Sequence, residues 1–318
     1  MMLIPSLRYL DTVHITRLFH EGRIPLEHLT LMALPQINKR EIIRKYRLMY
    51  KKDIDHRIID AARGDTPKEQ FVANVYQFSI QELLDHGATF RIYKGYLDLL
   101  GQHLGSLAGL EHIPDVEKVT ILNLSNNQLT TLQPKIFQPL APQLLTLDLS
   151  HNRLTTIPPD VFSGLSALQR LYLNHNHLTT IAPGVFQDLT QLKLLHLDHN
   201  DLTELKPGTF HGLTLLKSLS LNANQLTHLS SNIFHSIPQL EWFHLDHNHL
   251  ATLPLSIFQN LINLKWLYLN HNFLKNLSPK TFEHTAKLKV LSIEANPMLS
   301  SKTIEQLRRT LPQVDLKV

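Results

Sequence analysis

The chain has no cysteine among its 318 residues. Disulfide bonds, thiolate nucleophiles and cysteine-ligated zinc are therefore excluded. Three common catalytic signatures are also missing: a phosphate-binding glycine loop, a nucleophile elbow and an H-E-x-x-H zinc motif. Ser220 would lie beside His196 and His244 on neighbouring strands, but the repeat described below accounts for that triangle. We therefore expect a protein that is not an enzyme and that holds no cofactor.

Long apolar runs are missing as well, since no stretch is long enough to span a bilayer. Met1 to Asp11 lack the basic region and apolar core of a secretory signal, so we expect neither a signal peptide nor stable membrane insertion. The formal net charge of +4 does not by itself indicate nucleic-acid binding. Basic residues gather between Asn38 and Arg57, which favours the solvated face of an amphipathic helix. An acidic partner or a membrane surface is the alternative for this stretch.

A repeat dominates the second part of the chain. An asparagine returns eight times, at an interval of 25 and then of 24 residues. The eight positions are Asn127, Asn152, Asn176, Asn200, Asn224, Asn248, Asn272 and Asn296. Leucines hold fixed places around each asparagine, as in Leu168, Leu171, Leu173, Asn176 and Leu178. The unit therefore reads L-x-x-L-x-L-x-x-N-x-L.

This spacing predicts one short strand per repeat, because alternate side chains of a strand point to the same side. The asparagine ends the strand, and its side chain can satisfy backbone groups of its own turn and of the next coil. We therefore expect the asparagine column inside the protein. A phenylalanine column should stack beneath the convex side. It comprises Phe137, Phe162, Phe186, Phe210, Phe234, Phe258 and Phe282.

The unit resembles the leucine-rich repeat of the 24-residue kind, over about residues 117–299. The resemblance implies an α/β fold, a right-handed leucine-rich-repeat solenoid whose parallel concave sheet binds another macromolecule, usually a protein. Many extracellular relatives close their ends with disulfide-bonded caps, so the lack of cysteine favours a reducing compartment or a bacterial origin. In this respect the chain is similar to cysteine-free bacterial effector-type proteins.

We expect three parts: an all-α N-terminal capping domain (1–112), about eight repeats (113–299) and a C-terminal helical cap (300–318). Helical spacing interrupted by glycine and proline predicts the helices of the first part, among them Ile80–Asp85 and Tyr93–Ser106. Caps are needed because an open solenoid exposes its leucine core at both ends.

A short run near the N-terminus allows a second interpretation. Ile24 to Leu29, followed by Ile42 and Ile43, looks slightly like an F-box, the module that docks adaptors onto ubiquitin ligases. It lacks the expected tryptophan and stands far before the repeats. The alternative function is therefore a substrate adaptor of a ubiquitin ligase, with the repeats binding the substrate.

The residues between the leucines of each strand should form the concave face, which makes them the candidates for binding. Trp242 and Trp266 are the only tryptophans and hold equivalent places on adjacent strands, so their indoles should touch. Large rings mixed with polar groups are typical of protein interfaces. The predicted protein-binding residues are Arg170, Tyr172, His196, Asp198, Trp242, His244, Asp246, Trp266, Tyr268 and Asn270. Rings that only cover a neighbouring strand are the alternative.

Histidine holds the place just before the asparagine in five repeats, at His151, His175, His199, His247 and His271. Two trios also recur, His196-Asp198-His199 and His244-Asp246-His247. Each trio could contribute to a zinc or nickel site. Copying of a favoured coil explains the recurrence better, and we assign no metal site from the sequence.

The sequence thus predicts a non-enzymatic, monomeric protein-interaction module that binds a partner protein through its concave face and binds no nucleic acid. We expect it in the cytoplasm, or secreted without a cleaved signal peptide into a host cytosol. There it would act as a bacterial effector that blocks or recruits a host or effector protein.

Overall fold

The computed structural model describes residues 78–318, except for residues 86, 87, 89 and 103. Most of the predicted N-terminal helical domain, the basic stretch and the F-box-like run lie outside the described residues. Of the predicted helices discussed above, Ile80–Asp85 is present as α7.

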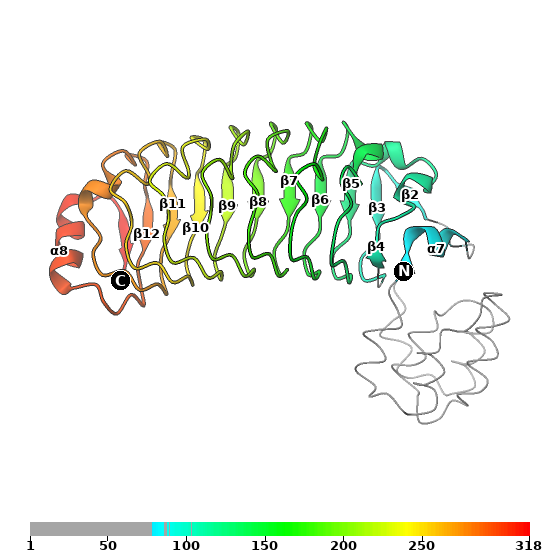
Figure 1. Cartoon of the computed structure of the whole chain (residues 1–318). Helices are drawn as coiled ribbons and strands as arrows, with labels where there is room; N and C mark the ends of the chain where they lie inside the picture. The colour runs from blue at the N-terminus through cyan, green and yellow to red at the C-terminus, as the bar shows by residue number, and fades with distance from the viewer. Residues whose placement is uncertain (1–77, 86–87, 89, 103) are drawn as a thin grey trace, which may run out of the picture. The chain divides into compact units, whose positions relative to one another are not determined.

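An 11-stranded sheet runs through the whole described part of the chain (Figure 1). Its strands follow one another in chain order, and all neighbours are parallel except the antiparallel pair β2 and β3. The strands are β2 (Ile92–Tyr93), β3 (Tyr96–Asp98), β5 (Ile121–Asn123), β6 (Thr146–Asp148), β7 (Arg170–Tyr172), β8 (Leu194–His196), β9 (Ser218–Ser220), β10 (Trp242–His244), β11 (Trp266–Tyr268), β12 (Val290–Ser292) and β13 (Asp315–Lys317). The predicted parallel solenoid is confirmed.

One apolar core lies behind the sheet. Leu173, Leu197 and Leu221 are fully buried on successive coils, and the backbone N–H of Leu173 donates to the carbonyl of His196 on the next coil at 2.9 Å. The same alternation repeats along the sheet, so inward side chains of neighbouring strands form a continuous apolar column. No coil could bury this surface alone, which makes the stack the stable unit.

The asparagine column is buried, as predicted. The amide group of Asn176 donates to the carbonyl of Leu173 in its own turn at 3.1 Å and to that of Leu149 at 3.0 Å. Its side-chain oxygen accepts the backbone N–H of Leu154 at 3.0 Å. Leu149 and Leu154 belong to the preceding coil, so the expectation of bonds to the next coil is wrong in direction. Each asparagine therefore ties its coil to the one before it.

The phenylalanine column is also buried, and its rings stack in pairs, for example Phe162 on Phe186 with centroids 6.0 Å apart. Phe243 of β10 stands where neighbouring strands carry leucine. Its ring meets those of Phe234 and Phe258 edge-on, at 4.7 and 6.5 Å between centroids. The chain behind the sheet runs mainly through turns, with 3₁₀ segments at η3 (Gln138–Leu140) and η4 (Pro279–Phe282).

The predicted helix Tyr93–Ser106 is wrong. That segment forms β2, β3 and β4 (Leu104–Ser106), and β4 pairs with β1 (Phe78–Ser79). Gly95, at φ +78°, makes the turn between β2 and β3, where a Cβ would lie 2.5 Å from the Thr120 hydroxyl oxygen. The 3₁₀ segments η1 (Leu110–His112) and η2 (Val116–Lys118) lead into β5.

The coil that contains β3 is a degenerate repeat. Leu97 and Leu99 are buried and two residues apart, as in a strand, and Leu97 is in register with Leu122 of β5. Gln102 holds the place of the asparagine and donates to the carbonyl of Leu100 at 3.1 Å. The sheet therefore begins before the expected boundary at residue 113.

The C-terminal tail contains the expected helix, α8 (Ser301–Thr310). The Ser300 hydroxyl accepts the backbone N–H of Thr303 and caps its first turn. Leu307 is fully buried. The tail also contains a strand that the helical spacing did not predict, since β13 pairs with β12 and places Leu316 opposite Leu291. A helix and a final strand close this end together.

Candidate functional site: the sheet face of the repeats

The outward side chains of β7 to β11, and those just beyond each strand, form the surface that we call the sheet face. All ten predicted binding residues lie on it. The register sets Arg170 beside Leu194 and Tyr172 beside His196 on β7 and β8. The same register sets tryptophan beside tryptophan and histidine beside tyrosine on β10 and β11. Between these two groups β9 carries the small residues Ser218 and Ser220.

Trp242 and Trp266 are stacked, as the sequence predicts, with ring centroids 3.5 Å apart and ring planes 12° from parallel. Trp242 is 40% exposed. The ammonium groups of Lys265 and Lys289 lie 5.7 and 5.9 Å from the Trp266 ring. The pair is therefore a flat apolar platform bordered by positive charge.

A second stack continues the platform along β10 and β11. The His244 and Tyr268 rings are 4.4 Å apart and 9° from parallel. The carboxylate of Asp246 lies 3.5 Å from Nδ1 of His244, and its Oδ1 atom is buried without a hydrogen-bond partner. The nearby imidazole of His244 holds this carboxylate against the ring stack.

The group on β7 and β8 has a different geometry. The Tyr172 and His196 rings meet edge to face, 5.3 Å apart at 85°. Burial lowers the pKa of His196, and the nearby His244 lowers it further, while Asp198 and Asp148 oppose the shift. Nδ1 of His196 lies 3.9 Å from Asp198. The two groups of rings are therefore close enough for their histidines to interact across β9.

An ion-pair group at the rim of the sheet face was missed by the sequence reasoning. The Glu241 carboxylate binds the Lys265 ammonium group and lies 3.6 Å from that of Lys217. The hydrogen bond from Lys265 is the main cause that lowers the pKa of Glu241. The signal was present in the sequence, since the place just before each strand runs Gln169, Lys193, Lys217, Glu241, Lys265 and Lys289.

The repeats that carry this face match the models of a known family. Models described as leucine rich repeat match residues 142–202, 190–250 and 244–298, and a further one matches residues 118–140. The chain belongs to the leucine-rich repeat family. None of the curated proteins matches this sequence.

Solved structures of other leucine-rich repeat proteins share the fold. A leucine-rich repeat protein of Leptospira interrogans, LIC12759, is 27% identical with a TM-score of 0.60, over 79% of this chain and 68% of that one. The TLR13–ssRNA13 complex is 23% identical with a TM-score of 0.63, over 85% and 42%. The Toll–Spatzle complex of Drosophila is 23% identical with a TM-score of 0.59, over 68% and 28%. The chain thus spans less than half the length of the TLR13 and Toll chains.

The histidines before the asparagines share an unusual backbone. His151, His175 and His199 have φ near +52°, as do the residues at the same place in the other repeats. This left-handed conformation is one that histidine adopts more readily than most residues. It stacks the imidazoles of successive repeats, with His175 and His199 4.2 Å apart and His247 and His271 4.1 Å apart.

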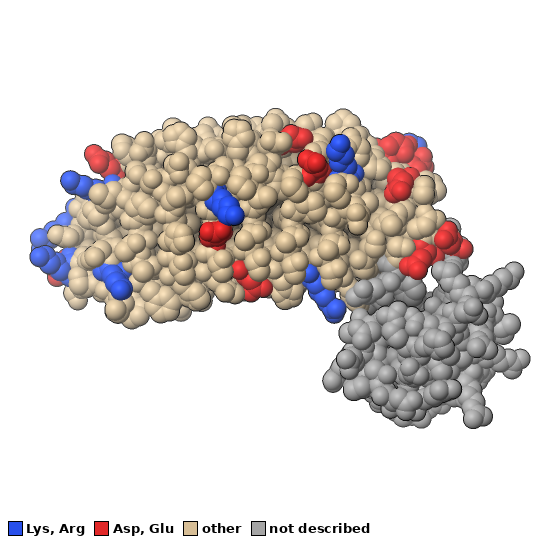
Figure 2. Space-filling model, viewed as in Figure 1, with Lys and Arg blue, Asp and Glu red and all other residues tan. Residues whose placement is uncertain are grey.

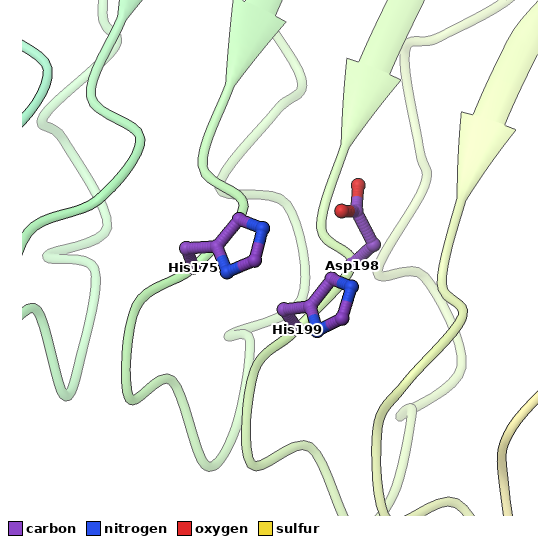
Figure 3. Close-up of side chains that lie close together, drawn as sticks. All are labelled: His175, Asp198 and His199. Atoms are coloured by element: carbon purple, nitrogen blue, oxygen red, sulfur yellow. The ribbon is translucent and has the colours of Figure 1, made fainter.

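The structure groups the histidines and aspartates of this leucine-rich repeat protein differently from the two trios noted in the sequence. The three donors that come together are those of His175, Asp198 and His199, within 4.8 Å of one another (Figure 3). In the described residues His196 is not part of that group, and His244, Asp246 and His247 form no such cluster. Burial and the neighbouring imidazoles of His151 and His199 lower the pKa of His175.

Charge is sparse on the side of the repeats turned to the viewer in Figure 2, where basic and acidic side chains lie scattered over the strands. Basic side chains gather at the end formed by α8. In the part of the chain that the structure describes, no helix is long and apolar enough to cross a membrane.

Proposed function

We propose that this leucine-rich repeat protein is a binding module that holds a partner protein on its sheet face. The observation that carries the proposal is the stacked pair of Trp242 and Trp266. Stacking already restricts both rings, so these two side chains lose little further entropy when a partner covers them. Tryptophan is also among the residues most enriched at the energetic centres of interfaces.

Polar groups around the platform favour specific binding of one partner over non-specific hydrophobic association. Asp246 offers a carboxylate, Asn270 offers an amide, and Lys265 and Lys289 border the rings. Apolar centres ringed by hydrogen-bonding groups are the usual composition of protein interfaces. We therefore infer that the partner presents an apolar side chain to the tryptophans and donors to the Asp246 carboxylate.

The charges of the sheet face favour a protein over a nucleic acid. Among the solved relatives, TLR13 forms a complex with ssRNA13 and Toll forms a complex with Spatzle. Here Asp198 and Asp246 hold the same place in two repeats of the sheet face and would repel phosphates.

We also propose where the protein acts and in what role. A cysteine-free chain suits a reducing compartment. Similarity to a leucine-rich repeat protein of Leptospira interrogans supports a bacterial origin. On that basis we propose an effector that blocks or recruits a host or effector protein. Affinity purification with the intact chain as bait, from a host-cell lysate and in parallel from a bacterial lysate, tests this setting. Recovery of a partner from the bacterial lysate alone would contradict a role in host cells.

The test of the sheet face compares the intact chain with the double variant Trp242→Ala/Trp266→Ala. After the partner has been isolated with the wild-type chain, its affinity for both forms is measured by calorimetric titration. We expect a loss of at least ~2 kcal/mol, or about 30-fold, in the double variant.

Phe273→Ala is the matched control, because Phe273 is a half-exposed aromatic residue that lies outside the strands of the sheet. It should leave the affinity unchanged. An unchanged affinity in a folded double variant would show that the rings only cover their own strands, and would overturn the proposal.

A further inference from the structure

We propose that His175, Asp198 and His199 form a binding site for a divalent transition-metal ion of the zinc class. Two imidazole nitrogens and a carboxylate oxygen lie within 4.8 Å of one another. Histidine and aspartate are first-choice ligands for Zn²⁺, and three protein ligands with an open fourth position are a common arrangement. The site shares Asp198 with the proposed interface, and its two histidines are not among the ten interface residues.

The fold brings these three donors together from two coils. The backbone N–H of His175 donates to the carbonyl of Asp198 at 3.0 Å, which fixes the two turns beside each other. The left-handed φ of His175 and His199 turns both side chains the same way. Figure 3 shows both imidazoles beside the carboxylate at the ends of neighbouring strands.

Only small movements separate this arrangement from a coordinated one. Tetrahedral Zn²⁺ with bonds near 2.1 Å requires ligand atoms roughly 3.4 Å apart. His175 and His199 stack with planes 9° from parallel, so one ring must tilt for both nitrogens to converge on one ion. His199 is exposed and can rotate, while His175 and Asp198 are half-buried. Binding therefore replaces the ring stack with metal bonds.

The repeats provide an internal comparison. His247 and His271 stack in the same way, but Asn270 stands where Asp198 stands in the other pair. In the described residues the trio of His175, Asp198 and His199 is the one group of three such ligands. The carboxylate thus distinguishes the proposed site from a repeated histidine ladder.

Few groups support the ligand side chains, and this limits the expected affinity for Zn²⁺. No hydrogen bond orients either imidazole among the described residues. Sites without such outer partners bind metal about 10- to 100-fold more weakly. We therefore expect reversible binding of Zn²⁺ that dialysis against a chelator removes.

The experiment is a calorimetric titration of the dialysed full chain with Zn²⁺ at neutral pH. Asp198→Asn gives the first site the composition of the second, and we expect it to weaken one binding event at least about tenfold. His175→Ala and His199→Ala should do the same. His247→Ala, the matched control, should leave that event unchanged.

The reverse variant is Asn270→Asp, which supplies the missing carboxylate between His247 and His271. We expect it to add one equivalent of bound Zn²⁺. Circular dichroism checks that each variant is folded. Zn²⁺ bound by the other histidines of the chain adds the same background to every variant. The proposal would be overturned if Asp198→Asn bound Zn²⁺ as the wild type does, or if His247→Ala lost as much affinity as the site variants. It would also be overturned if Asn270→Asp bound no additional equivalent of Zn²⁺.

Discussion

The strands from β7 to β11 have a buried side and an exposed side that follow opposite rules. Toward the core the same place is occupied by Leu171, Leu195, Leu219, Phe243 and Leu267. Next to it, on the sheet face, stand Tyr172, His196, Ser220, His244 and Tyr268. Backbone register is identical for both sets. The core therefore fixes the scaffold, and the exposed side is free to carry chemistry.

The largest loss of stability is expected on the buried side, from substitution of the polar residue Asn200. Its amide group donates to the carbonyls of Leu173 and Leu197, and its oxygen accepts the backbone N–H of Leu178. In Asn200→Ala these buried groups lose their partner, at ~1–3 kcal/mol for each one left unsatisfied. We expect the free energy of unfolding, measured in urea, to fall by about 3 kcal/mol or more.

Asn222→Ala is the control on the exposed side of the neighbouring turn. The structure shows the Asn222 backbone carbonyl accepting bonds from His199 and Asn224, which the substitution keeps. Surface changes of this kind usually stay within about 0.5 kcal/mol. Equal losses in the two variants would contradict the distinction between the two sides.

A smaller loss of stability is expected at Phe243, the one residue at this buried place of β7 to β11 that is not leucine. Phe243→Leu restores the residue that the neighbouring strands carry. It also removes the edge-on contacts with Phe234 and Phe258 and leaves unfilled volume, which costs about 1–2 kcal/mol. Urea unfolding of Phe243→Leu measures the loss.

The reverse exchange on the neighbouring strand β9, Leu219→Phe, should also destabilise the protein, by about 1–3 kcal/mol, because the core there is already filled. A Phe243→Leu variant more stable than the wild type would show that the repeat consensus, rather than local packing, decides this position.

Sequence predicted the regular part of the fold because period two and period 24 follow directly from strand geometry and stacking. Leu171, Asn176 and Phe186 could therefore be placed correctly inside. The β3 coil was missed because Gln102 replaces the marker asparagine and only Leu97 and Leu99 keep the pattern. Hydrophobic spacing over so short a run cannot separate strand from helix.

Within the candidate site, the contact between Trp242 and Trp266 could be predicted because strand register alone brings them together. The grouping of His175 with Asp198 could not. It depends on the left-handed φ of the residue before each asparagine, which sets the direction of its side chain. Leucine spacing contains no information about that dihedral angle.

The smallest effect is expected at Glu241, on the rim of the sheet face. Its pKa is lowered from the ordinary value of 4.5, mainly by the hydrogen bond from Lys265. A group with a lowered pKa in the folded state stabilises the protein above its unfolded value, and this contribution disappears as the pH falls through the folded pKa. Because the pair is partly exposed, Glu241→Gln should cost only about 0.5–1 kcal/mol at pH 7.

The difference in free energy of unfolding between wild type and Glu241→Gln should shrink toward zero when urea unfolding is repeated below the lowered pKa. High salt should also reduce it at neutral pH. Glu305→Gln serves as a reference, because Glu305 pairs with Arg309 at 3.9 Å on the exposed surface of α8 and should contribute less. A difference that stayed constant with pH would show that the side chain acts through packing rather than charge.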